Sequence, residues 1–290
     1  MRVALVVNPT SGKRKGNEIA RRAAERLVQA GHDVTEVLSE GGSSALGALE
    51  KVLVEPIDIV VIVGGDGALH DVLPALIDRD ITVAMVPAGT GNDVARQLGV
   101  GEPDRALEAL AAGRVQTIDV IAVGDDRFVA TVVASGFDSK VNERANAMRW
   151  PRGNMRYNRA ILAELRSFKP LDFTITADGH VLERQAMLVA VANMPSFGGG
   201  LRIGEGACDD DGELDVIVIH PVSTLKLLRV FPMLYRGTHT KLPEFERIRA
   251  REVTWSSPGI VAYGDGERIG PLPLTARVVP GALRMIVGER

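Results

Sequence analysis

Two glycine turns, Gly64-Gly65-Asp66-Gly67 and Gly89-Thr90-Gly91-Asn92-Asp93, most constrain how this chain can fold. Each follows a short run of apolar β-forming residues, at positions 59–63 and 81–87, and each precedes apolar residues at helical spacing. Continuous apolar runs of this length are typical of buried parallel strands. The sequence therefore predicts the order strand, glycine turn, helix twice, with both turns at the same edge of one sheet.

Such turns are suited to binding phosphate. A glycine turn lets anionic oxygens approach backbone amides closely, and a following helix adds free N–H donors. A third element, Asn8-Pro9-Thr10-Ser11-Gly12-Lys13, ends the first apolar run at residues 3–7. All three lie where α/β sheets bind ligands, although each turn taken alone is also compatible with tight packing only.

The common phosphate-binding patterns are absent. The dinucleotide pattern G-x-G-x-x-G fails because His70 stands where the third glycine would follow Gly65 and Gly67. Ser11-Gly12-Lys13 lacks the upstream glycine and the trailing Ser or Thr of a P-loop. A nucleotide site in this chain would have to be of another kind.

The spacing of apolar residues divides the chain in two. Residues 1–122 alternate apolar runs with helical stretches, which predicts an α/β domain with a parallel sheet. Residues 123–290 carry shorter runs, such as 173–177 and 181–185 around Asp178-Gly179-His180, a hairpin signal. We therefore expect a mainly antiparallel β-sandwich there, with its last strand at residues 283–287.

Composition excludes several classes of protein. With 290 residues, 46% of them hydrophobic, the chain can build a sizeable core. A net charge of −3 argues against nonspecific nucleic-acid binding. A single cysteine, Cys208, excludes an intramolecular disulfide. The sequence has no apolar run near the ~18 residues of a membrane span and no leader pattern, so we expect a cytoplasmic protein.

The three early motifs, in this order and spacing, resemble those of the diacylglycerol kinase family, and its bacterial soluble members most closely. Later motifs extend the resemblance over nearly the whole chain: residues 197–200, residues 210–215 and Asp265-Gly266-Glu267. The resemblance implies transfer of the γ-phosphoryl group of ATP to a lipid hydroxyl, converting diacylglycerol to phosphatidic acid. It also implies an active cleft between the two domains.

Specific residues acquire expected roles from this resemblance. Asp265 is expected to accept the hydroxyl proton, although locally it also reads as a hairpin turn. Asp66 is expected to hold the Mg²⁺ of the nucleotide, and Glu267 to steer the nucleotide unless it is a solvated strand residue. The residues expected to contact ATP are Asn8, Pro9, Thr10, Ser11, Gly12, Ser39, Gly64, Gly65, Asp66, Gly67, Gly89, Thr90, Gly91, Asn92, Asp93 and Glu267.

The acidic stretch at residues 209–213 is a second candidate metal site. It lacks the spaced ligands of an EF-hand, and by itself it predicts a β-turn. In the family it resembles, a structural Mg²⁺ is held here by one Asp side chain and neighbouring carbonyls. That arrangement maps to the side chain of Asp211 with the carbonyls of Cys208 and Glu213.

Two positions depart from the family pattern. Ala68 replaces a Thr whose hydroxyl could hydrogen-bond phosphate, and loss of such a bond costs roughly 1.5 to 3 kcal/mol. His70-Asp71 replaces the usual Asn-Glu, and we interpret His70 as a helix-surface residue. A kinase for another lipid of the sphingoid type therefore stays open, as does a catalytically weakened regulator that binds nucleotide or lipid. NAD kinases share the first glycine turn.

Two segments without acidic residues suggest transient contact with a membrane surface. Residues 144–163 combine five arginines with Met148, Trp150, Met155 and Tyr157, and residues 220–243 combine basic and apolar residues around Pro232. Such mixtures suit anionic headgroups, and for the second segment we expect a helix pair interrupted at Pro232. Ordinary packing on the sandwich is the alternative. Association into a homodimer is also left open.

Overall fold

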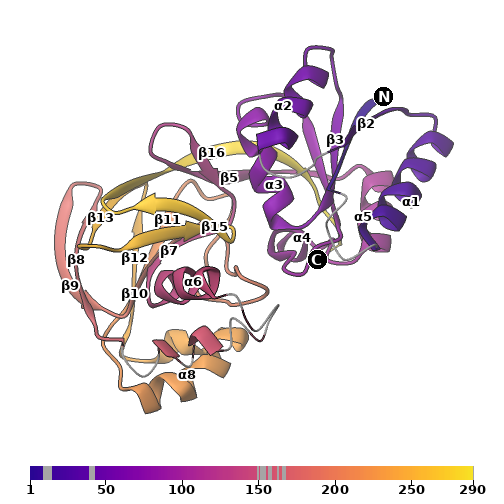
Figure 1. Ribbon diagram of the computed structural model, residues 1–290. Coiled ribbons are helices and arrows are strands. Elements are labelled where there is room, and N and C mark those ends of the chain that lie inside the picture. The colour runs from indigo at the N-terminus through magenta and orange to yellow at the C-terminus, as the bar shows by residue number, and fades with distance from the viewer. Residues whose placement is uncertain are drawn as a thin grey trace.

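The computed structural model describes residues 1–8, 15–38, 43–148, 150, 155, 159–161, 163–164 and 168–289. Figure 1 shows an N-terminal α/β unit and a C-terminal unit of packed antiparallel strands, connected by the long strands β5 (Val115–Val123) and β16 (Leu274–Ile286). The predicted fold class is confirmed.

The N-terminal unit is built on parallel strands in the order β2-β1-β3-β4. In Figure 1, α1 and α5 lie on one side of this sheet, and α2 and α3 lie on the other. The bounds are β1 Arg2–Val7, α1 Lys15–Gln29, β2 Asp33–Leu38, α2 Ser43–Val52, β3 Ile59–Gly64, α3 Asp66–Val72, β4 Thr82–Pro87, α4 Asp93–Gln97 and α5 Pro103–Ala112, with a 3₁₀ turn η1 at Leu73–Ala75.

The apolar runs recognised in the sequence form the core of this unit. Every residue of β3 is buried, and Leu69 of α3 packs into the same core with no exposed surface. Burial on both faces explains why these strands show no alternation of apolar and polar residues. The two glycine turns follow β3 and β4, which are neighbours paired from Ile59↔Thr82 to Gly64↔Pro87.

The C-terminal unit packs two layers of antiparallel strands. One layer continues the first sheet through β16, β13, β8 and β9, with β5 on β16 and β6 on β5, and the other has the order β12-β11-β10-β7-β14-β15. The bounds are β6 Arg127–Val129, β7 Val132–Gly136, β8 Leu171–Ala177, β9 His180–Ala186, β10 Leu188–Ala192, β11 Leu214–Ile219, β12 Phe245–Ala250, β13 Glu252–Ser256, β14 Val261–Gly264 and β15 Glu267–Pro271.

A buried tryptophan connects the two layers. Trp255 of β13 has no exposed surface, and its indole N–H donates to the hydroxyl of Ser135 in β7 over 2.9 Å. A buried Trp needs such a partner for its N–H. The predicted hairpin at Asp178-Gly179 joins β8 and β9, with φ of 45° and 83° at the two turn residues.

The last strand differs from its predicted extent. β16 begins at Leu274, pairs with β13 and β5, and reaches β4 of the parallel sheet at Arg284 and Met285. A shift in register between Val279 and Leu283, around Pro280 and Gly281, hides this continuity in the sequence. Because β16 belongs to both units, the predicted boundary at residue 122 stays a prediction.

Two helices with described bounds cover the outer face of the second layer. They are α6 (Phe137–Ala147) and α8 (Thr224–Arg236), which is followed by a 3₁₀ turn η2 at Thr238–Lys241. Pro232 lies inside α8, so the expected helix pair is wrong: one helix passes through the proline. No helix among the described residues is long and apolar enough to cross a membrane.

Candidate active site

The two glycine turns lie side by side, and their backbones are in contact. A Cβ atom on Gly89 would lie 2.7 Å from the Cα of Gly65, closer than real Cβ atoms approach. Glycine is therefore required where β3 and β4 end. A Cβ atom on Gly67 would meet nothing within 4 Å, so its backbone faces open space.

Asp66 connects the first turn to the helix that follows the second. Its two carboxylate oxygens accept hydrogen bonds from the backbone N–H groups of Asp93 and Val94, each over 3.0 Å. Burial raises the pKa of Asp66 above its ordinary value of 3.8; these two bonds act in the opposite direction, and the charges of Asp93 and Asp265 add to the rise. Asp66 thus fixes α4 while its carboxylate stays at the cavity.

Asn92 and Asp93 hold the second turn and the C-terminal unit. The side chain of Asn92 accepts from the N–H of Gly89 and donates to the carbonyl of the same residue. Asp93, 1% exposed, accepts from the N–H groups of Gly199 and Gly200 over 2.7 and 2.9 Å. Both side chains therefore have structural partners, and Asp93 joins the two units.

Asp265 is held at the β14–β15 turn with φ of +50°. Its carboxylate accepts hydrogen bonds from the N–H groups of Ala130 and Thr131, over 2.9 and 3.0 Å, and from the Thr131 hydroxyl over 2.6 Å. The Asp265 side chain is 1% exposed. These bonds fix the carboxylate at the entrance of β7, facing the α/β unit.

His70 approaches Asp265 from the opposite side of the cleft. Its Nδ1 lies 3.4 Å from Oδ2 of Asp265, and the imidazole is half-buried. The interpretation of His70 as a helix-surface residue is therefore wrong. Burial lowers the pKa of His70, but the hydrogen bond to Asp265 and the charges of Asp265, Glu267 and Asp71 outweigh burial and raise the pKa above 6.5.

One cavity of about 1330 Å³ runs along this site. Thr131, Ala68 and Asp71 line it together with predicted site residues from both units: Asn8, Gly65, Asp66, Gly67, Gly89, Thr90, Gly91, Asp93, Asp265 and Glu267. Gly64 and Asn92 are not among the lining residues, and Pro9, Thr10, Ser11, Gly12 and Ser39 fall outside the described residues. The cavity therefore joins the glycine turns to Asp265.

The same cavity continues between α6, α8 and the second layer of strands, where its lining is mainly apolar. The apolar residues there include Phe137, Val141, Met187, Leu188, Ile219 and Phe245. Each belongs to a segment that looks like ordinary core in the sequence, so no local pattern announces the apolar lining. Its only signal is the number of apolar residues on α6 and α8.

Asp138 is a carboxyl group within this apolar part. It lies in the first turn of α6, lines the cavity, and accepts a hydrogen bond from the side chain of Asn142 over 3.2 Å. Burial raises the pKa of Asp138 from 3.8 to about 6, and the bond from Asn142 only partly offsets this rise. At neutral pH the carboxylate form predominates, but it is less stable in the folded protein than in the unfolded chain.

Replacing Asp138 with Asn should raise the free energy of unfolding by up to about 3 kcal/mol at pH 7.5, because each pKa unit corresponds to about 1.4 kcal/mol. The folded pKa exceeds the unfolded one, so native stability falls as pH rises from about 4 through 6. Urea unfolding at pH 4.0 and 7.5 measures this, with Asp33→Asn on an exposed strand as control. A gain of equal size at both pH values would contradict the assignment.

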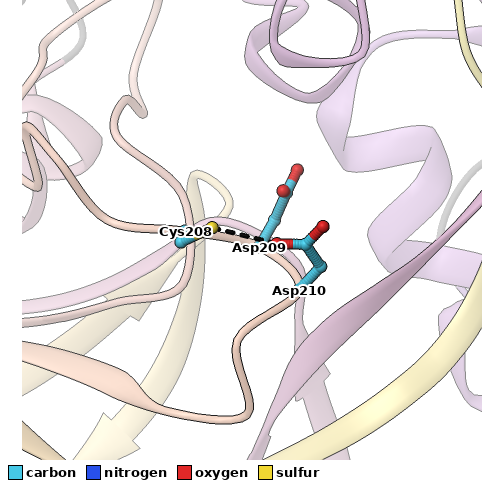
Figure 2. Close-up of side chains that lie close together, drawn as sticks. All are labelled: Cys208, Asp209 and Asp210. Carbon is cyan, nitrogen blue, oxygen red and sulfur yellow. Dashed lines mark hydrogen bonds between the residues drawn. The ribbon is translucent and has the colours of Figure 1, made fainter.

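The expected second metal site lies away from the cavity. Asp211 accepts from the N–H of Glu213 over 3.1 Å, and both carboxylates pair with Arg249. Figure 2 shows the neighbouring cluster of Cys208, Asp209 and Asp210, in which the Cys208 thiol donates to Asp210 over 2.9 Å and one potential ligand atom of each residue lies within 4.8 Å of the others. Metal binding at Asp211, Cys208 and Glu213 stays a prediction.

Asp119 holds this loop, and sequence reasoning missed it. It is 2% exposed in β5, and its carboxylate accepts from the N–H groups of Gly212 and Gly281, each over 2.7 Å. Its own N–H donates to the carbonyl of Asp209. An acid inside the apolar run of β5 was the signal available, since buried carboxylates are rare unless paired.

Comparisons with known proteins agree with this geometry. The profile of the diacylglycerol kinase catalytic domain matches residues 2–123, and that of the YegS C-terminal NAD kinase beta sandwich-like domain matches residues 131–287. A Mycobacterium tuberculosis protein named diacylglycerol kinase is 39% identical over 292 residues, covering 98% of this chain and 94% of that protein. A Bacillus subtilis protein of the same name is 24% identical over 277 residues, covering 94% and 91%.

Two solved structures share the fold. The crystal structure of a diacylglycerol kinase from Bacillus anthracis has a TM-score of 0.77 at 22% identity, covering 99% of this chain and 97% of that one. An NAD kinase from Archaeoglobus fulgidus in complex with ATP has a TM-score of 0.57 at 16% identity, covering 100% and 94%. At these identities the likeness establishes the arrangement of strands and helices alone.

Proposed function

Because the chain belongs to the diacylglycerol kinase family, we propose that it is a lipid kinase that transfers the γ-phosphoryl group of ATP to a lipid hydroxyl. Diacylglycerol is the proposed acceptor and phosphatidic acid the product. The observation that carries this proposal is the single cavity that joins the glycine turns and Asp265 to an apolar lining.

The polar part of the cavity supports a triphosphate. Gly65, Gly67, Gly89 and Gly91 line it without side chains, so phosphate oxygens can approach the backbone. Phosphoryl transfer depends mainly on positioning and on neutralising charge. The fold shared with an ATP-bound NAD kinase is compatible with a nucleotide at this position.

Asp66 fits an Mg²⁺ ion. Mg²⁺ prefers carboxylate oxygens and keeps several waters, and from the described residues each Asp66 oxygen accepts one N–H. A carboxylate has about four acceptor positions, so further ligation is open to it. When bound there, Mg²⁺ would neutralise charge on the phosphates.

Asp265 is proposed to accept the proton of the acceptor hydroxyl as that oxygen bonds to the γ-phosphorus and the bond to the ADP oxygen breaks. Three donors from Ala130 and Thr131 hold the carboxylate in one orientation. A fixed carboxylate at the cavity suits an acceptor that must be aligned with the nucleotide. Glu267, on the same turn, is proposed to contact the nucleotide.

The apolar lining favours a lipid over a polar dinucleotide. Residues of α6, β10, β11 and α8 supply it, and burying acyl chains there gains roughly 0.8 kcal/mol per CH₂ group. A polar dinucleotide would lose its hydration against the same wall without gaining hydrogen bonds. The proposed acceptor class follows from this difference.

Transfer of labelled γ-phosphate from Mg-ATP to a panel of lipids in mixed micelles tests the proposal. The panel contains diacylglycerol, monoacylglycerol and a sphingoid base, and dinucleotide NAD serves as the polar acceptor. Labelled phosphatidic acid is the expected product. Labelling of another lipid alone would change the acceptor, whereas measurable ATP binding without any labelled product would favour a regulator, consistent with Ala68 lining the cavity without a donor.

The cavity is proposed to receive its lipid from a membrane surface beside α8. Val230, Leu234 and Tyr235 of this helix line the cavity, Tyr235 is 49% exposed, and Arg229 and Arg236 are exposed. In the first basic segment Trp150 and Met155 are 72% and 67% exposed, and the Arg159 guanidinium lies 5.6 Å from the Trp150 ring centroid. Arg149, Arg152, Arg156 and Tyr157 of that segment fall outside the described residues.

Replacing Arg229 and Arg236 together with Gln should weaken binding to anionic vesicles about 30-fold, because each basic residue near such a surface contributes about 1 kcal/mol. Vesicle co-sedimentation at fixed ionic strength measures the effect. Arg79 and Arg105, exposed on the α/β unit, are the matched control pair when both become Gln. An equal loss of vesicle affinity in the two double variants would show that net charge alone decides binding, and would contradict a specific role for α8.

A further inference from the structure

His70 and Asp265 come from different units of the chain. His70 lies on α3 directly after the first glycine turn, and Asp265 lies on the turn between β14 and β15. Among the described residues, two sets of polar contacts cross the cleft: the 3.4 Å contact between Nδ1 of His70 and Oδ2 of Asp265, and the hydrogen bonds from Gly199 and Gly200 to Asp93.

His70 contacts Asp265 across the cleft but does not line the cavity. Asp265, Gly266, Glu267 and Asp71 line the cavity, whereas His70 is not among the lining residues. Its side chain is 19% exposed, and that of Asp265 is 1% exposed. We therefore expect His70 to act on substrate through Asp265 rather than by direct contact.

Among the described residues, the charged groups that act on His70 are acidic. Asp265 and Glu267 face it from the β14–β15 turn, and Asp71 faces it from its own helix, each favouring the charged imidazole. Asp66 at the start of α3 adds a further carboxylate to this part of the cavity. An imidazolium is the compensating charge that such a group of carboxylates needs when a triphosphate also binds nearby.

We infer that His70 is a positioning residue for phosphoryl transfer, which holds Oδ2 of Asp265 from the α/β unit and balances the acidic end of the cavity. The inference rests on the proposed function. Thr131 holds one oxygen of Asp265, while Ala130 and His70 hold the other. Of these described contacts, the one with His70 comes from the unit that carries the glycine turns, so it aligns the carboxylate with the nucleotide.

The charge of His70 gives this role a dependence on pH. The imidazole is charged below its raised pKa and neutral above it. Its electrostatic contribution to catalysis therefore declines as pH rises through that pKa. The Asn found at this position in the family pattern keeps an amide donor and carries no charge. His70→Asn therefore separates the hydrogen bond from the charge, and His70→Leu removes both.

The first measurement does not depend on catalytic activity. The pKa of His70, followed by NMR of its ring carbon in the full chain, should fall when Asp265 becomes Asn, and the resonance of His180, exposed at the start of β9, should be unchanged. The titration uses the protein alone, without added lipid or ATP. A His70 pKa that is the same in native protein and Asp265→Asn overturns the pairing, whatever the reaction proves to be.

The second measurement is the ratio of native to variant kcat/KM between pH 5.5 and 9. For His70→Asn we expect a ratio of about tenfold at pH 6 that declines to near one above the His70 pKa, and for His70→Leu a loss that persists at high pH. A ratio independent of pH for His70→Asn overturns the role of the charge. Inactivity of the native chain on every lipid would instead count against the proposed function.

Discussion

Replacing Asp265 with Asn should lower kcat about 10²- to 10⁴-fold, the usual contribution of a positioned proton acceptor. Asn has nearly the same shape as Asp, but its amide cannot take the hydroxyl proton. The KM for ATP should change little, because Asp265 is proposed to act on the acceptor rather than on the nucleotide. Initial rates with Mg-ATP and the preferred lipid measure both parameters.

The chain contains a matched control for this variant. Asp178 occupies a second Asp-Gly hairpin turn with φ of 45°, and its carboxylate accepts from the N–H groups of Arg251 and Glu252. Asp178 is not among the cavity-lining residues. Asp178→Asn should thus disturb a similar turn and keep kcat within about twofold of native. A kcat for Asp265→Asn within tenfold of native would remove Asp265 from the proposed role.

The two Asp-Gly turns also show what the sequence can and cannot predict. Both give the same hairpin signal, and both form hairpins with a left-handed Asp. Only the fold distinguishes them, because β14 lies beside β7 and brings Asp265 to Thr131, 134 positions away along the chain. Local pattern predicts the turn, while the pairing of distant strands decides what the turn faces.

The glycine turns were predictable for a related reason. Parallel strands with both faces buried must be apolar throughout, and their turns must be glycine where the two backbones meet. Those demands are local and appear directly in the sequence at Gly65 and Gly89. The partners of Asp93 and His70 are not local, since Gly199 and Asp265 belong to the other unit.

The apolar part of the cavity could not be predicted, because its lining residues have the same character as core. Leu188 begins β10 directly after Met187, Ile219 ends β11, and Phe137 begins α6. Whether such residues touch each other or leave a space depends on how far α6 and α8 stand from the sheet. That distance follows from packing over the whole unit.

Replacing Asp119 with Ala should lower the free energy of unfolding by about 3 to 6 kcal/mol. Its carboxylate accepts two backbone N–H groups, and hydrogen bonds to a charged group contribute about 1.5 to 3 kcal/mol each. Ala leaves the N–H groups of Gly212 and Gly281 without this acceptor. Against a usual total of roughly 5 to 15 kcal/mol, this loss would unfold a substantial part of the protein at 37 °C.

Urea unfolding at pH 7.5 measures the Asp119 effect, with Asp126→Ala on the exposed β5–β6 turn as the control, for which we expect a change within about 0.5 kcal/mol. The intermediate variant Asp119→Asn keeps one acceptor oxygen and turns an amide donor toward the other N–H. Its free energy of unfolding should therefore fall by at least half as much as that of the Ala variant.

Because β16 turns at Gly281 before it reaches β4, the Ala variant should also loosen the C-terminal strand. Faster amide exchange at Leu283 and Met285, ahead of exchange in β3, is the expected sign, and exchange that accelerates equally in both strands would mean that Asp119 stabilises the fold only globally.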